Sequence, residues 1–121
     1  MNTLNIFCNS YSGELALYQK CHEWIEQHAF RPITAEYTAE AMGCTVAHLN
    51  RTVKKYSNKC LSVTIAEARI SAIKQFVKFS NSSSQDIAQK LGFESVELLR
   101  KFFKYHTGVS LKEYKKQYFN T

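Results

Sequence analysis

The chain has 121 residues, 45% of them hydrophobic, which suits one domain or two small subdomains that share a helix and leaves enough apolar surface for a core without disulfides. No apolar run reaches the length of about 18 residues that would suggest a membrane span, and the start lacks the pattern of a signal peptide, so we expect a cytoplasmic protein. The net charge of +6 is uneven, with 14 Lys/Arg and 5 Asp/Glu in residues 51–121 against 2 and 5 in residues 1–50, and this asymmetry suggests a face for a polyanion.

The first third of the chain is predicted to form a tail and one amphipathic helix. Residues 1–13 have a mixed composition and are expected to form a tail or linker. From Glu14 to about His28, apolar residues recur at helical spacing. Pro32 follows, where a helix cannot continue.

Two shorter helices are predicted next. Thr34 is a good N-cap for a helix that stops at Gly43. Thr45 caps a third helix, which runs to Tyr56. The tight connection between these two helices is the first of two similar ones.

The second half of the chain is predicted to form four more helices. A long helix over 61–79 is followed by a polar run, 80–83, whose Ser83 caps a helix that ends at Gly92. Ser95 caps another helix, and the last one covers 110–118. No segment alternates like a strand, so we predict an all-α fold of seven helices.

An internal repeat supports this division. Residues 39–43 (AEAMG) return 49 positions later as residues 88–92 (AQKLG). After an insertion of one residue the spacing becomes 50, and the matching pairs are Leu49 and Leu99, Arg51 and Lys101, Val53 and Phe103, and Lys54 and Lys104.

Each copy has the features of a helix-turn-helix. Two helices that cross through a tight turn need a residue that tolerates unusual backbone angles, here Gly43 and Gly92. They also need a small side chain where the backbones approach, here Ala39 and Ala88. Because each copy is followed by a basic amphipathic helix, the repeat indicates DNA binding.

The sequence resembles the AraC/XylS family of transcription activators over about residues 14–118. The resemblance is carried by Ile33-Thr34-x-Glu36, Ala39-Glu40-Ala41-Met42-Gly43, Leu49-x-Arg51-x-x-Lys54-Lys55, Arg69-Ile70, Asp86-Ile87-Ala88-x-x-Leu91-Gly92-Phe93-Glu94-Ser95, Phe103-Lys104 and Gly108-Val109-Ser110-Leu111-x-Glu113-Tyr114. It implies two helix-turn-helix subdomains, 14–60 and 80–121, joined by a linker helix, 61–79. The DNA-facing helices implied by the family are 46–56 and 95–105.

The outward residues of these two helices are the predicted DNA contacts. Asn suits the edge of adenine and Arg that of guanine, because each offers two groups at the required spacing. The predicted base-reading residues are Ala47, His48, Asn50, Arg51, Arg100 and Lys101. The predicted phosphate contacts are Thr45, Lys54, Lys55, Ser95 and Lys104, with backbone N–H groups at the helix N-termini as further donors.

The linker helix sets the expected mode of binding. A helix of about 19 residues is roughly 28 Å long, and one turn of DNA is about 34–36 Å. We therefore expect both recognition helices to enter successive major grooves of double-stranded DNA. Val96, Glu97 and Leu98 stand where the family commonly has polar DNA-contacting residues, so the second helix is expected to be the less specific one.

Other functions compete with this prediction. The same helices could dock RNA polymerase, a predicted partner in any case, or a partner domain without DNA selectivity. His22 beside Cys21 and His48 near Cys44 are the only support for a thiol or metal site, and neither pair has zinc-ligand spacing. We expect no enzyme activity, no cofactor and no metal. The four cysteines, which include Cys8 and Cys60, are expected to be reduced thiols. Two alternatives stay open: a complete small regulator, or the C-terminal half of a longer regulator with further domains, which the tail slightly favours.

Overall fold

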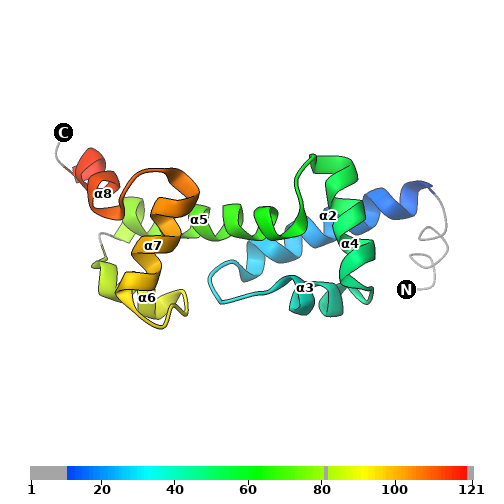
Figure 1. Cartoon of the computed structure of the whole chain (residues 1–121), viewed down its shortest axis with the longest axis horizontal. Coiled ribbons are helices and arrows are strands. Elements are labelled where there is room, and N and C mark those ends of the chain that lie inside the picture. Colours follow the sequence, from blue (N-terminus) through cyan, green and yellow to red (C-terminus); the bar gives the residue numbers. More distant parts are fainter. Residues whose placement is uncertain (1–10, 81, 120–121) are drawn as a thin grey trace. The chain divides into compact units, whose positions relative to one another are not determined.

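The computed structural model describes residues 11–80 and 82–119, and every regular element within them is an α-helix. The helices (Figure 1) are α2 (Tyr11–His28), α3 (Ala35–Met42), α4 (Val46–Ser57), α5 (Leu61–Ser80), α6 (Ser84–Lys90), α7 (Val96–Thr107) and α8 (Leu111–Phe119). Within these residues the predicted all-α fold with seven helices is confirmed. None of these helices combines the length and apolar character that crossing a membrane requires.

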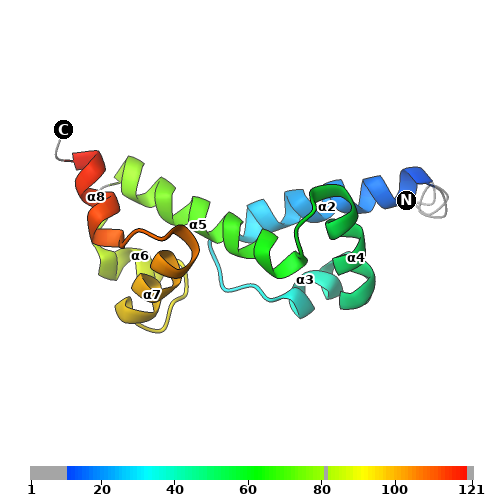
Figure 2. The same cartoon turned by 45° about the horizontal axis from the view of Figure 1, so that its top comes forward.

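The described residues fall into two compact units. Unit 1 takes residues 11–28 and 33–65, and unit 2 takes residues 29–32, 66–80 and 82–119. Each unit holds one of the two predicted helix pairs. In unit 1, α3 and α4 pack on each other and on α2 (Figures 1 and 2), and in unit 2 α7 packs on α6 and α8.

Hydroxyl side chains fix where the short helices begin. Each N-cap oxygen accepts a hydrogen bond from the backbone N–H three residues later, which satisfies a donor that the helix itself cannot pair. These bonds, of 3.0–3.2 Å, are made by Thr34, Thr45, Ser83, Ser95 and Ser110. The predicted helix starts are thus confirmed, except that α2 begins at Tyr11, three residues earlier than expected.

The turn between α3 and α4 depends on Gly43. Its φ of 76° lies in the left-handed region, which a residue with a Cβ adopts at a cost. The turn is closed by hydrogen bonds from Gly43 N to Glu40 O and from Cys44 N to Ala39 O, both 3.0 Å. This pair of bonds satisfies two of the last four carbonyls of α3.

The turn between α6 and α7 repeats this geometry and adds a close approach. Gly92 has a φ of 80°, and Phe93 N donates to Ala88 O over 2.8 Å. A Cβ on Gly92 would lie 2.4 Å from Cδ of Pro32, whereas a Cβ on Gly43 would meet nothing within 4 Å. Gly92 is therefore required for its backbone angle and for space.

The core of unit 1 buries one face from each of its helices. Two of its members are threonines, Thr38 and Thr52, which are 0% and 2% exposed. Their hydroxyls donate to the carbonyls of Thr34 (2.7 Å) and His48 (3.0 Å), so neither polar group is left unsatisfied. The apolar members are Cys21, Ile25, Ile33, Ala39, Leu49, Val53, Leu61 and Ile65.

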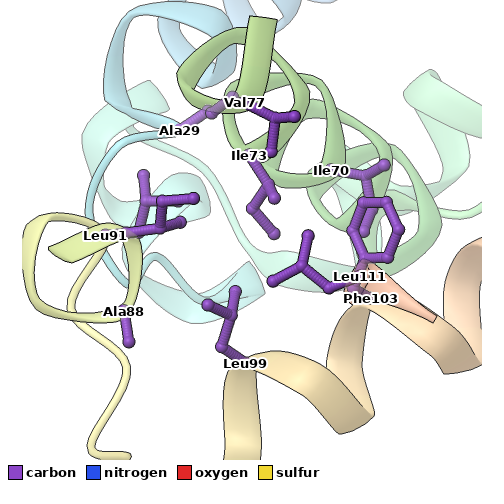
Figure 3. Packing of buried hydrophobic residues seen from close by; sticks show 11 residues of the cluster. Ala29, Ile70, Ile73, Val77, Ala88, Leu91, Leu99, Phe103 and Leu111 are labelled. Atoms are coloured by element: carbon purple, nitrogen blue, oxygen red, sulfur yellow. The ribbon is translucent and has the colours of Figure 1, made fainter. Parts of the chain in front are cut away.

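The core of unit 2 gathers around the second half of α5. Figure 3 shows Ile70, Ile73 and Val77 of α5 facing side chains of the other helices of the unit. The remaining members of the cluster are Ala29, Ala72, Ile87, Ala88, Leu91, Leu99, Phe103 and Leu111. This packing fixes one face of α7 and leaves the opposite face to solvent.

A buried arginine holds the turn of unit 2 in place. Arg69 is 6% exposed, and its guanidinium donates to the carbonyls of Ala29 (3.1 Å), Leu91 (2.9 Å) and Arg31. It also stacks over the ring of Phe93, 4.9 Å from the centroid. Burial lowers the pKa of Arg69 from its ordinary value, yet an arginine stays charged at such sites.

Candidate nucleic-acid interface

One face of α4 is fixed by the core of unit 1 and the opposite face is free. Leu49 and Val53 are 0% and 1% exposed. On the other side, Ala47, Arg51 and Lys54 are exposed and follow one another at spacings of four and three residues, so they share one face. A small residue, a bidentate donor and a point charge therefore line the exposed side of α4.

The N-terminus of α4 presents a further set of donors. The Thr45 hydroxyl accepts from His48 N over 3.1 Å and is exposed to solvent. The first N–H groups of a helix carry partial positive charge and suit an anion. His48 is half-buried, which limits its reach toward a ligand.

Asn50 has a structural partner that the sequence pattern did not suggest. Its Oδ1 accepts a hydrogen bond of 2.8 Å from Leu61 N, the first residue of α5. The side chain thereby caps α5, while Cys60, at the cap position, contacts the Ser62 hydroxyl instead. Base reading by Asn50 stays a prediction, and the contact with Leu61 is its observed role.

Lys55 is paired within unit 1. Its Nζ lies 2.7 Å from Oε1 of Glu14 on α2, and both side chains are partly exposed. The hydrogen bond and charge of Lys55 hold the pKa of Glu14 below its ordinary value, and the charge of His48 adds to this effect. A phosphate at Lys55 would therefore compete with the Glu14 carboxylate.

Helix α7 of unit 2 is held in the same manner as α4. Leu99 and Phe103 are both fully buried. The face equivalent to that of α4 carries Glu97, Lys101 and Lys104, all exposed. Two of the three are cationic, but the first position holds a carboxylate, which phosphate would repel.

Arg100 lies one turn before Lys104 on α7 and lines a basic hollow in unit 2 together with it. The hollow has a volume of about 710 Å³. Five cations and two hydroxyls surround it, and its lining residues are Ser84, Arg100, Lys101, Lys104, Ser110, Leu111, Lys112 and Lys115. The structure thus brings the three predicted α7 cations together with two α8 lysines that were not predicted.

Lys115 is oriented toward α6 at this hollow. Its Nζ donates to Ser84 Oγ over 3.2 Å. Partial burial lowers the pKa of Lys115, and the charge of Arg100 contributes to the shift. The α8 lysines were missed because they lie outside the helix-turn-helix pattern, and only their positive charge distinguishes them in the sequence.

The cysteines of the described region are free thiols. Burial, with a contribution from Cys44, raises the pKa of Cys21 to about 11, and burial also raises the pKa of Cys44. Hydrogen bonding to Ser62 lowers that of Cys60. Cys8 lies outside the described residues. Within the part of the chain that the structure describes, no three His, Cys, Asp or Glu residues are grouped to hold a metal ion.

Comparison with known sequences gives matches over most of the chain. The model of a helix-turn-helix domain family matches residues 38–117. The multiple antibiotic resistance protein MarA of Escherichia coli (strain K12) is 31% identical over 93 residues, which cover 77% of this chain and 73% of that protein. The HTH-type transcriptional activator Btr of Bacillus subtilis (strain 168) is 27% identical over 76 residues, or 63% of this chain and 14% of Btr.

Solved structures share the fold. The C-terminal domain of AraT, a response regulator from Geobacillus stearothermophilus, superposes with a TM-score of 0.76 at 19% identity, covering 84% of each chain. The DNA-binding domain of AdpA, a global transcriptional factor solved in complex with a target DNA, gives a TM-score of 0.73 at 19% identity, covering 84% of this chain and 91% of the other.

Proposed function

The chain belongs to the AraC/XylS family of helix-turn-helix transcription regulators, and we propose from this premise that it binds double-stranded DNA sequence-specifically through α4 and α7 and so regulates transcription. In this proposal residues 14–60 and 80–121 each carry one DNA-binding helix pair, and residues 61–79 form the linker helix, whose second half packs within unit 2. The family is one of regulators and not of enzymes.

The observation that carries the proposal is the pair of capped, half-buried helices after tight glycine turns. Both α4 and α7 have 12 residues, begin at a hydroxyl N-cap and bury one face while the other carries cations. A helix supported in this way by the helix before it suits insertion into a major groove, which admits one α-helix.

Arg51 is the residue that we assign to base reading on α4. It is exposed and lies opposite the buried Leu49 and Val53. Its guanidinium can donate two hydrogen bonds to the O6 and N7 atoms of guanine. Ala47, one turn earlier, leaves room for the helix to approach the bases.

The charged groups around Arg51 serve the DNA backbone in this proposal. Lys54 lies on the same face, one turn later, and is assigned to phosphate. The N-termini of α4 at Thr45 and of α7 at Ser95 offer backbone N–H groups to further phosphates. On α7 we assign base contact to Lys101, which matches Arg51 at the repeat spacing of 50 residues.

Two broader parts of the proposal follow from DNA binding. RNA polymerase is the partner expected of a transcription activator. Bacterial DNA lies in the cytoplasm, so we place the protein there.

Selection of binding sites from random-sequence DNA tests the proposal. We expect two blocks of preferred bases separated by about one helical turn, 10–10.5 base pairs. With about five to eight phosphates contacted, log K should fall with log salt at a slope of about −4 to −7. A protein-interaction adaptor would enrich no sequence, and a slope near zero at a selected site would contradict the role of the basic face.

A further inference from the structure

We propose that the basic hollow of unit 2 binds consecutive backbone phosphates of the DNA, and that Arg100 is a phosphate ligand there and not a base reader. The inference rests on the proposed function and assigns to the DNA a surface beyond the two recognition helices. Its ligand class is the phosphodiester chain, and its residues come from α6, α7 and α8.

The lining of the hollow selects for an anion. Arg100, Lys101 and Lys104 come from α7, and Lys112 and Lys115 come from α8. No carboxylate is among the lining residues, and none of the five cations has an ion pair with another residue that the structure describes. An anion placed among these five cations would be attracted by each of them and would offset their mutual repulsion.

The arrangement of Arg100 and Lys115 supports this assignment. Both residues line the hollow, and burial, with a contribution from the charge of Arg100, lowers the pKa of Lys115. Lys115 is held by its hydrogen bond to Ser84 Oγ, which orders the ammonium group before any ligand arrives. A phosphate oxygen would offset the repulsion between the two cations.

The equivalent corner of unit 1 is built differently. There Asn50 supplies an acceptor, Oδ1, to Leu61 N at the start of α5. At the spacing of 50 residues, Arg100 replaces Asn50, and Leu111, which also lines the hollow, replaces Leu61. Arginine has donors only and cannot cap α8 as Asn50 caps α5. Ser110 caps α8 instead, and a phosphate at this corner would lie beside a helix N-terminus, which favours an anion.

The volume of about 710 Å³ lies in the range of ligand-binding clefts, roughly 300–1,000 Å³. The cations lie along two helices, with Arg100 and Lys104 one turn apart on α7. Such a row suits a strand of the DNA backbone passing over unit 2. Unit 2 would then contribute mainly affinity, which is independent of sequence.

The test compares three full-chain variants on a selected duplex and a scrambled duplex at several salt concentrations. Lys112→Gln/Lys115→Gln should weaken binding to both duplexes by the same factor and make the salt slope shallower by about two. Lys116→Gln is the matched control, because Lys116 is exposed on α8 but does not line the hollow. The salt slope of Lys116→Gln should lie closer to that of the unmodified chain than the slope of the double variant does. Equal thermal unfolding of all variants shows that folding is unchanged.

Arg100→Gln separates the two roles of that residue. Equal loss on both duplexes supports a phosphate contact, whereas loss confined to the selected duplex identifies a base contact and overturns the assignment. If the salt slope of Lys112→Gln/Lys115→Gln equals that of the unmodified chain, the proposal for the hollow is overturned. The proposed function is tested separately, by whether the unmodified chain prefers the selected duplex to the scrambled one. Inorganic pyrophosphate tests whether the ligand is a free anion instead. If the unmodified chain binds pyrophosphate tightly and Lys112→Gln/Lys115→Gln does not, while both bind the duplexes equally well, the hollow does not bind the DNA backbone.

Discussion

Helices α4 and α7 occupy equivalent places in the two units and share their internal design. Each has a hydroxyl N-cap and a left-handed C-cap, Asn58 in α4 and Gly108 in α7. Even the last turns match, because the Ser57 and Thr107 hydroxyls both donate over 2.7 Å to the carbonyl four residues earlier. The two ends of the recognition helix are thus built in the same way in both copies within this chain.

The exposed sides differ. Where α4 has Ala47 and Arg51, α7 has Glu97 and Lys101. A bidentate donor behind a small residue suits a base edge, whereas a lysine behind a carboxylate makes a single charged contact. The difference indicates that the fold constrains one face of each helix, and that the other face is free to specialise in sequence or in affinity.

The largest expected effect concerns the two turns. Gly92→Ala should destabilise unit 2 by about 3 kcal/mol or more, because a left-handed alanine costs about 1–2 kcal/mol and the new Cβ would clash with the ring of Pro32. Gly43→Ala should cost only the backbone part, about 1–2 kcal/mol, since its Cβ would meet nothing. Chemical denaturation of each variant measures the difference.

Two equal losses in that experiment would mean that the chain near Pro32 moves away at little cost. The turn of unit 2 would then be no more tightly packed than that of unit 1. The double variant provides a further control, because losses in separate units should add.

The fold was largely predictable because its determinants are local. Each N-cap lies three residues from its hydrogen-bond partner, and the glycine turns are recognisable from the repeat alone. The start of α2 at Tyr11 was not predicted, since Tyr11 to Gly13 lacks a strong helix signal.

The site was only partly predictable because its contacts are not local. The exposed positions of Arg51, Lys54 and Lys101 follow from helical periodicity. The pairing of Lys55 with Glu14 spans 41 residues, and the hollow needs three helices to be placed together. Asn50 shows the same limit, because nothing in its own helix indicates that its amide contacts α5.

The second prediction compares the two recognition helices directly. Arg51→Ala should cost about 1–3 kcal/mol of specific binding and relax the preference for one guanine. Lys101→Ala should cost less, and selected sites should show a sharp block of bases under α4 and a degenerate block under α7. Site selection with each variant, followed by titration on selected and scrambled duplexes, measures both effects.

Equal sharpness of the two blocks would refute this asymmetry. If Arg51→Ala weakens both duplexes alike, Arg51 contacts phosphate and base reading must reside elsewhere on α4. Lys54→Ala is the control, because a phosphate contact should weaken all sequences equally and make the salt slope shallower by about one.

The smallest expected effect concerns Glu14, which pairs with Lys55 in unit 1. Glu14→Gln should release Lys55 for a phosphate, strengthen binding to selected and scrambled duplexes alike, and make the salt slope steeper by about one. The same variant should be slightly less stable at neutral pH, because it loses the ion pair.

The pH dependence of stability gives an independent check on this pairing. The pKa of Glu14 is lowered in the folded protein, so the stabilisation is fully present above the ordinary value of 4.5 and is lost as the pH falls through the lower folded value. The difference in unfolding free energy between the unmodified chain and Glu14→Gln should therefore disappear in strong acid. A difference in stability that persists in strong acid would have another origin than the ion pair. If Glu14→Gln binds DNA as the unmodified chain does, Lys55 does not face the DNA backbone. Stability and DNA binding should change in opposite directions at neutral pH, because the Glu14 carboxylate and a phosphate compete for the same ammonium group.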